Sequence, residues 1–514
     1  MQTKKAPLFN TVQMERPTTN RFDLTHDVKL SCNMGQLIPI MVMDCVPGDR
    51  HHISCESLIR FAPLVSPVMH RFWVTMHYFF VPNRILWPNW EKWITGGDYL
   101  STPPVHPFIE YREGDGTFTP LLDYMGLPIP LVGGGDEAIS PMALAAYQKI
   151  VDEYYRDENL VPSTWTELVD GDNAVNQAVL STLHRRAWQH DYFTSCLPYA
   201  QKGNPVEIPI GGFQDVDVKL NQQQHNFSDA FWDADAGIVP TPIVVNVPGG
   251  GPSATLPSDL YAETSALVPD ATTINDLRRA FRLQEFLEKN ARGGTRYIEN
   301  ILVHFGVRSS DKRLQRPEYI TGTKSPVMIS EVLNTTGTAT APQGEMAGHG
   351  IGHVRGGYGD SFFCEEHGYI IGIMSIMPDT AYQQGIEKHW LKYKDKYQHY
   401  WPSFAHIGEQ PVENREIYGF QGAAGDDTFG YVPRYAEYKF MNNRVAGDFR
   451  TTLDFWQAGR IFATPPALNQ AFIECTPDDR IFAVTTPTVQ KLYVQVINKI
   501  SSSRPMSIFG SPSF

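Results

Sequence analysis

The sequence predicts a mainly β fold built from antiparallel sheets, and two observations support this prediction. Of its 514 residues, 42% are apolar and only 19% are charged, while 41 Gly and 38 Pro favour many loops that join short strands. In the early chain, apolar runs end at Pro, Gly or Asp turns, and no helical pattern separates one run from the next. Strands joined without helical crossovers pair antiparallel, so we expect a sandwich or a barrel and not an α/β fold.

Strand patterns begin at Arg21, after an irregular segment, residues 1–20, that we expect to form an N-terminal arm. A frayed end and an arm lying across a neighbouring subunit both remain open for it. Further along, apolar and polar side chains alternate, or apolar residues follow one another, in residues 26–31, 37–46, 53–57, 71–81, 369–377, 431–440 and 488–497. We expect each stretch to be a strand of a single domain that covers residues 21–514.

Residues 84–200 depart from the strand pattern and are predicted to be an insertion of helices and loops. Its tryptophans at 87, 90 and 93 stand three apart, as one face of a short helix would place them. Residues 141–159 and 183–192 contain strong helix formers, so we expect a helix in each.

Residues 203–272 are predicted to be a second, acidic insertion. They contain nine Asp or Glu and one Lys, and several Gly and Pro residues mark loops and extended segments. Carboxylates and loop backbone groups need water, so we expect this insertion to project from the surface.

Residues 273–316 combine a predicted helix with a concentration of positive charge. Thr273 and Asp276 suit a helix start, and Asn290–Gly294 suit its end. Ten basic residues face four acidic ones between residues 278 and 316, in a chain of formal charge −13: Arg278, Arg279, Arg282, Lys289, Arg292, Arg296, Arg308, Lys312, Arg313 and Arg316. A polyanion such as DNA, and ion pairs to acidic residues across subunit contacts, are both open explanations.

Residues 388–401 interleave lysines with aromatic side chains. The residues concerned are Lys388, Trp390, Lys392, Tyr393, Lys394, Lys396, Tyr397, Tyr400 and Trp401. Lysines that pair with phosphates and rings that stack on bases are typical of proteins that bind single strands regardless of sequence. An aromatic interface or core cluster with extended lysine side chains is the alternative.

The sequence predicts no catalytic site, no metal site and no cofactor. His349 and His353 stand four apart, but the glycines around them disfavour a helix, so we expect a flexible loop there. Cys364 and His367 lack a second cluster that would complete four ligands, and we expect a turn at a strand edge. The paired carboxylates at 365–366 and 426–427 are adjacent in sequence and would point to opposite faces of a strand, which does not suit acid–base catalysis.

The cysteines at 32, 45, 55, 196, 364 and 475 are scattered and form no Cys-x-x-Cys pair, which predicts reduced thiols in a cytoplasmic setting. The N-terminus lacks the apolar region of a secretory signal, and the longest apolar runs are too short to span a bilayer. We therefore expect a protein that is made without export and does not insert into membranes.

Three motifs stand close together in the chain, at residues 291–297 (ARGGTRY), 305–307 (FGV) and 314–319 (LQRPEY). They resemble the major capsid protein of microviruses, small icosahedral phages with single-stranded DNA, and the gokushovirus branch most of all. The resemblance continues in residues 21–24, 35–40, 47–49, 78–84, 400–402 and 434–438. Residues 203–272 match nothing specific in the family.

This resemblance implies an eight-stranded antiparallel jelly-roll barrel of the viral coat type, with long loop and helical insertions. Copies of it would build a T=1 shell around a circular single-stranded DNA genome, without enzymatic activity. By position and composition, residues 203–272 would form a protrusion at the threefold axes that contacts the host. Candidate host-contact residues in it are Phe227, Phe231, Trp232, Asp233 and Asp235.

The implied partners are further copies of the chain, single-stranded DNA, an internal scaffolding protein, a DNA pilot protein, a small basic DNA-binding protein and a host surface receptor. The expected location is the virion, after assembly in the bacterial cytoplasm. A β-sandwich protein that binds or degrades polysaccharide is the alternative, although the missing signal peptide and carboxylate pair count against it.

Overall fold

The computed structural model describes residues 18–96, 102–112, 114, 116–204, 206, 218–220, 260–262, 274–333, 346–357 and 361–509. The chain divides into two compact units, of which the first is Met1–Lys202 with Glu288–Phe514 and the second is Gly203–Leu287. In the second unit, strand β8 (Val218–Leu220) pairs antiparallel with β9 (Leu260–Ala262). Helix α5 (Ile274–Gly293) begins in the second unit and ends in the first.

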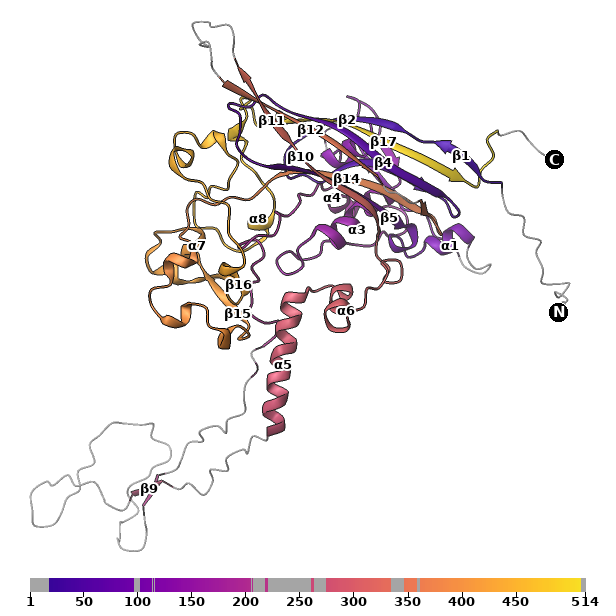
Figure 1. Cartoon of the computed structure of the whole chain (residues 1–514). Helices are drawn as coiled ribbons and strands as arrows, with labels where there is room; N and C mark the ends of the chain where they lie inside the picture. The colour runs from indigo at the N-terminus through magenta and orange to yellow at the C-terminus, as the bar shows by residue number, and fades with distance from the viewer. Residues whose placement is uncertain are drawn as a thin grey trace, which may run out of the picture. The chain divides into compact units, whose positions relative to one another are not determined.

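Two antiparallel sheets form the centre of the first unit (Figure 1). The larger is seven-stranded and contains β1 (Asn20–Asp23), β2 (His26–Cys32), β4 (Arg50–Phe61), β11 (Met328–Leu333), β12 (Met346–Gly357), β13 (Phe362–Phe363) and β17 (Leu492–Arg504). The smaller is four-stranded and contains β3 (Ile38–Cys45), β5 (Phe72–Pro82), β10 (Glu318–Pro326) and β14 (Gly368–Pro378).

The order of strands is set by pairing between distant parts of the chain. In the larger sheet β17 lies between β2 and β4, and β4 lies between β17 and β12. In the smaller sheet the order is β10-β5-β14-β3. The short strand β1 pairs with the end of β17, beyond the part of β17 that pairs with β2. The short strand β13 pairs with the start of β4, beyond the part of β4 that pairs with β12.

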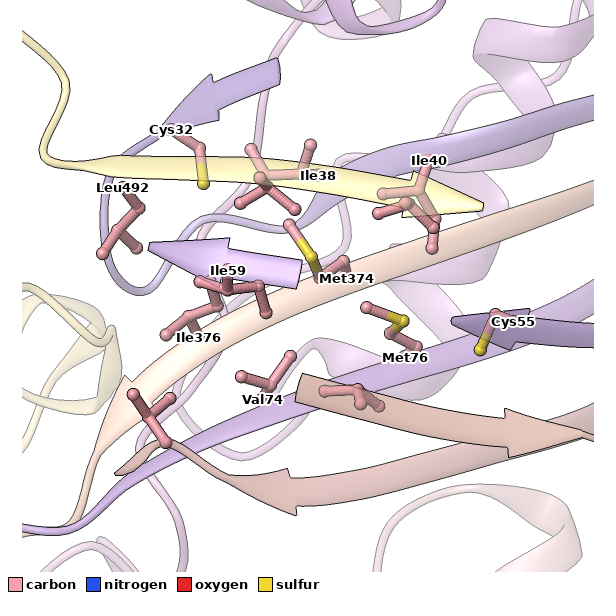
Figure 2. Packing of buried hydrophobic residues seen from close by; sticks show 14 of the residues in the cluster. Cys32, Ile38, Ile40, Cys55, Ile59, Val74, Met76, Met374, Ile376 and Leu492 are labelled. Carbon is pink, nitrogen blue, oxygen red and sulfur yellow. The ribbon is translucent and has the colours of Figure 1, made fainter. Parts of the chain in front are cut away.

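The main hydrophobic core lies between these sheets and takes apolar side chains from both. Along β4, buried side chains recur at every second residue, as expected for a strand with one face in a core. Figure 2 shows part of this packing, with Ile59 and Leu492 from the larger sheet and Ile38, Ile40, Val74, Met76, Met374 and Ile376 from the smaller one. Burial of this apolar surface is the main favourable contribution to the fold.

A second core covers the other face of the smaller sheet. Helix α3 (Met142–Ile150), which continues as one π-helical turn through Tyr155, packs there with the fully buried Trp87. Strands β5 and β14 are therefore buried on both faces, which explains their near-continuous apolar sequences.

The remaining elements are short or lie outside the two sheets. The helices are α1 (Trp90–Thr95), α2 (Pro120–Tyr124), α4 (Gln177–Leu180), α6 (Tyr297–Phe305), α7 (Asn414–Ile417) and α8 (Gln470–Ile473). Two further hairpin-like pairs are β6 (Ile109–Tyr111) with β7 (Glu137–Ile139) and β15 (Glu409–Glu413) with β16 (Thr428–Pro433). Among the described helices, none is both long and apolar enough to cross a bilayer.

Most strand predictions are confirmed, because β2, β3, β4, β5, β14 and β17 cover or overlap the expected ranges. The strand expected at 431–440 is wrong beyond Pro433, where the chain turns and forms a 3₁₀ helix at Ala436–Tyr438. The helices expected near 87–93, 141–159 and 273–294 are present, although the first begins at Trp90 and the second ends at Tyr155. Thr273 lies outside the described residues.

The helix predicted at 183–192 is wrong. The amide of Arg186 donates to Gly35 O over 2.8 Å, and its carbonyl accepts from the amide of Cys475 over 2.8 Å. Trp188 donates in the same way to Ile473 O. These bonds to distant segments replace helical ones, so tertiary structure overrides the local helix propensity.

The flexible loop predicted around His349 and His353 is also wrong, because both residues lie in strand β12. The glycines of β12 allow neighbouring segments to pack closely against this strand. A Cβ atom at Gly348 would collide with the backbone oxygen of Ser66, and one at Gly350 would lie 2.8 Å from the Phe61 ring. Cys364 and His367 lie in the expected turn, between β13 and β14.

Candidate capsid assembly and nucleic-acid interface

The predicted basic segment folds as two helices joined by a tight turn. α5 ends at Gly293, and Gly294 follows with φ +101°, a backbone conformation that glycine adopts without strain. α6 then begins after Arg296, whose amide donates to the carboxylate of Glu299 over 3.1 Å. This hydrogen bond fixes the start of α6 and the backbone position from which the Arg296 side chain extends.

Arg292 is bound inside its own subunit. Its guanidinium forms a bidentate ion pair with Glu409 at the start of β15, with Nε 3.2 Å from Oε1. It also donates to Ser195 O over 3.2 Å and to Tyr431 O over 3.4 Å. The Glu409 side chain is only 8% exposed, so this ion pair connects α5 to the β15–β16 pair below the surface.

Arg296 and Arg316 are held by the segment that follows α3. Arg296 Nε lies 3.0 Å from the carboxylate of Glu158, and its Nη2 donates to the carbonyl of Arg156 over 2.9 Å. Arg316 Nε lies 3.0 Å from the carboxylate of Glu153, and its guanidinium stacks 4.9 Å from the Tyr154 ring. Both side chains are largely buried, at 15% and 11% exposed.

The other predicted basic residues lie closer to solvent. Lys312 pairs with Glu365. Arg282 pairs with Glu285 over 2.6 Å within α5 and is 82% exposed. Arg308 and Arg313 are exposed and have no acidic partner among the described residues, and the same holds for Arg278 and Arg279 on α5. The segment is therefore not one uniform surface, because its charges divide into an internal set and an exposed set.

The lysines of residues 388–401 are mostly neutralised by acidic side chains. Lys388 lies 2.9 Å from Glu416 and 3.4 Å from Glu413, and attraction to these carboxylates raises its pKa although burial acts against that. Lys392 is 4% exposed and lies 2.7 Å from Glu437 and 3.6 Å from the centre of the Tyr438 ring.

The pKa of Glu437 is lowered because the Lys392 and Gln410 hydrogen bonds outweigh its burial. Lys394 pairs with Asp426 over 3.2 Å, at the surface. Lys396 has no acidic partner among the described residues. The predicted phosphate-binding charge is thus largely cancelled inside the subunit.

The aromatic side chains of the same segment, by contrast, face solvent. Trp390 is 71% and Tyr393 is 73% exposed, and the others are about half exposed. They form what we call the aromatic surface, which comprises Trp390, Tyr393, Tyr397, Tyr400, Trp401 and Tyr438. Hydrogen bonds hold Tyr400 and Trp401 in place, since the amide of Tyr400 donates to the Tyr438 hydroxyl over 3.3 Å and the Trp401 indole donates to Lys396 O over 3.1 Å.

Sequence analysis missed the acidic partners Glu413, Glu416 and Glu437, because no local pattern connects them to the lysines. A net charge counted over the whole of residues 388–437 would have been the available signal. The predicted host-contact residues Phe227, Phe231, Trp232, Asp233 and Asp235 lie outside the described residues, as does most of residues 203–272.

Over nearly its whole length the chain is similar to capsid proteins of phages. The family model described as capsid protein (F protein) matches residues 9–514. The chain is 34% identical to capsid protein VP1 of Chlamydia phage 1, with 98% of this chain and 97% of that protein covered. It is 33% identical to capsid protein VP1 of Bdellovibrio phage phiMH2K over 98% and 97% of the two chains. It is 30% identical to capsid protein VP1 of Spiroplasma virus 4 over 96% and 95%.

These relatives are capsid proteins of gokushoviruses, so the resemblance found in the sequence is confirmed. The capsid function is therefore favoured over the polysaccharide-binding alternative. A capsid protein has a structural role and is a component of the virion. From its motifs, its antiparallel sheets and its full-length similarity to these proteins, the chain belongs to the phage capsid protein (F protein) family.

Proposed function

We propose that copies of this chain assemble through the aromatic surface into a T=1 icosahedral shell that encloses a circular single-stranded DNA genome. The observation that carries the proposal is the exposure of Trp390 and Tyr393 beside lysines that are already paired within the subunit. Exposed aromatic side chains with little net charge are typical of the buried centre of protein interfaces. A surface for DNA would instead keep its lysines available for phosphates.

The strand order supports a jelly roll as the scaffold of this shell. Strands β2-β17-β4-β12 in one sheet face β3-β14-β5-β10 in the other. Successive strands along the chain therefore fall in alternate sheets for much of the fold, which is the arrangement that two interleaved Greek keys produce. We include residues 84–200 as its helical insertion and residues 1–20 as its N-terminal arm.

The exposed basic residues are the part of the predicted basic segment that remains for DNA or neighbouring subunits. These are Arg278, Arg279, Arg282, Lys289, Arg308 and Arg313. Their number is small against the chain's charge of −13. A small basic DNA-binding protein would therefore supply much of the charge that a packaged genome needs, and we propose an internal scaffolding protein and a DNA pilot protein as further partners.

We propose residues 203–272 as the threefold protrusion that contacts a host surface receptor, with Phe227, Phe231, Trp232, Asp233 and Asp235 as candidate contact residues. Their composition, with nine acidic residues against one lysine, suits an exposed projection. Assembly would take place in the cytoplasm of the bacterial host.

The assembly role can be tested by replacing Trp390 and Tyr393 with Ser in the full chain, expressed with its partner proteins. We expect soluble subunits with an unchanged melting temperature and a loss of shells, measured by sedimentation and electron microscopy. The matched control replaces both residues with Phe, which keeps the apolar rings and should preserve shells. Normal shell yields from the Ser variant would overturn the proposal.

A further inference from the structure

A cluster of two thiols, an imidazole and a carboxylate lies fully buried where the two sheets meet. Cys45 ends β3, Asp49 lies in the turn after it, His51 lies at the start of β4, and Cys364 follows β13. All four residues have a relative exposure of 0%. A buried imidazole or carboxylate is costly unless it is paired or binds a metal, whereas a neutral thiol is commonly buried.

The donor atoms of this cluster stand close together. The thiol sulfurs of Cys45 and Cys364 and a ring nitrogen of His51 all lie within 4.8 Å of one another. His51 Nε2 lies 3.5 Å from Asp49 Oδ2. Around a tetrahedral Zn²⁺, the known bond lengths place neighbouring donor atoms about 3.3–3.8 Å apart. The three donors of Cys45, His51 and Cys364 would contract by about 1 Å around the ion, and the Asp49 carboxylate, which lies outside this group of three, would move closer to complete the site.

Two polar atoms in the cluster have no hydrogen-bond partner in the described part of the chain, although both are buried. These atoms are Nε2 of His51 and Oδ1 of Asp49. The opposite ring nitrogen, Nδ1 of His51, is hydrogen-bonded to Ser502 Oγ over 2.7 Å. His51 is therefore held through Nδ1 while Nε2 lies beside the Asp49 carboxylate without a hydrogen bond, and a histidine that ligates a metal is commonly held through its other ring nitrogen in this way.

The backbone around the cluster fixes the positions of its donors. The amide of Cys364 donates to Asp49 O over 2.9 Å, and the amide of Gly48 donates to Cys364 O over 2.8 Å. His51 pairs in register with Phe362 of β13, and Cys45 pairs with Gly368 of β14. Asp49 is itself held, because its Oδ2 accepts from the Val46 amide over 3.0 Å and lies 3.3 Å from Arg504.

We propose that Cys45, Asp49, His51 and Cys364 bind one Zn²⁺ as a structural site that joins the two sheets. Two sulfurs, one imidazole nitrogen and one carboxylate oxygen match the donors and the coordination number of structural zinc. Binding releases the two thiol protons, and the resulting complex carries one negative charge, which Arg504 balances at the carboxylate. Since all four donors are buried, no coordination position remains open to a substrate.

This inference departs from the sequence prediction of no metal site. The sequence pattern connects Cys364 only with its neighbours up to His367, which lies on the far side of the turn. The partners Cys45 and His51 come from the other end of the chain, and only the pairing of β13 with β4 and of β14 with β3 brings them together.

The experiment measures the metal content of the purified full chain, prepared without chelators from zinc-containing medium. We expect about one zinc per chain, and a zinc X-ray absorption spectrum with two sulfur and two nitrogen or oxygen neighbours. The variant Cys45→Ser with Cys364→Ser should lose the zinc. The matched control is Cys55→Ser, which changes a buried cysteine outside the cluster, in β4, and this variant should retain the zinc.

Three results would overturn the proposal. One is a soluble wild-type chain that is free of zinc and has two unmodified thiols at these positions. Another is a peptide in which Cys45 and Cys364 are joined by a disulfide. The third is bound zinc whose absorption spectrum shows no sulfur neighbour. The wild-type measurements do not depend on the variants, so the test stands even if the Ser variant fails to fold.

Discussion

Replacing Arg292 with Ala should destabilise the subunit itself. The change leaves the buried carboxylate of Glu409 without its ion pair and removes a donor from the carbonyls of Ser195 and Tyr431. Removing one partner of a buried pair costs about 3–5 kcal/mol. Because the Arg292 side chain is 32% exposed, water compensates part of that loss, and we expect about 2–3 kcal/mol.

The assay is denaturant unfolding of the unassembled chain followed by tryptophan fluorescence, with shell formation measured on the same preparations. Arg313→Ala is the control, since Arg313 is exposed and lacks an acidic partner among the described residues, and it should stay within about 0.5 kcal/mol of wild type. Replacing Arg292 and Glu409 together with Met should recover most of the lost stability. If Arg292→Ala unfolds like wild type but forms no shells, Arg292 acts at a subunit contact and our reasoning is wrong.

Two further predictions concern acid and packing. Burial, together with nearby Arg186, lowers the pKa of His77 to about 4, so between pH 6.5 and 4 the unfolded chain takes up a proton that the folded chain does not. The free energy of unfolding should therefore fall on acidification, and this residue should account for about 2 kcal/mol of the fall at about pH 5. On the same acidification, the melting temperature of His77→Gln should drop less than that of wild type. Equal drops in the two proteins would contradict this prediction. Gly348→Ala should cost about 1–3 kcal/mol because its Cβ meets the backbone of Ser66, while Gly352→Ala, 3.4 Å from Val327, should melt near wild type.

The strands could be predicted because their patterns are local. Alternation in β4 reflects one buried face, and the continuous apolar runs of β5 and β14 reflect two. The failures occur where distant segments decide the backbone. Arg186 bonds to Gly35 and Cys475 instead of forming a helix, and the glycines of β12 exist for close contact with Phe61 and Ser66.

The candidate site was predicted only in part, since the sequence locates charged and aromatic residues but does not say which charges are already paired. In the sequence, Lys388 and Lys392 look available to bind phosphate. In the fold, they form ion pairs with Glu416 and Glu437. Their aromatic neighbours Trp390 and Tyr393 remain exposed, which shifts the interpretation from DNA toward subunit contact.

By itself the sequence determined the mainly β class, six of the eleven described strands in the two main sheets and the family, because alternation, turns and motifs are encoded in neighbouring residues. The tertiary structure decided which cations are neutralised and which thiols meet an imidazole, as for Arg292 with Glu409 and for Cys45 with Cys364 and His51. The physical reason is that ion pairing and metal coordination depend on distances of a few ångströms, and strand pairing sets those distances between residues far apart in the chain.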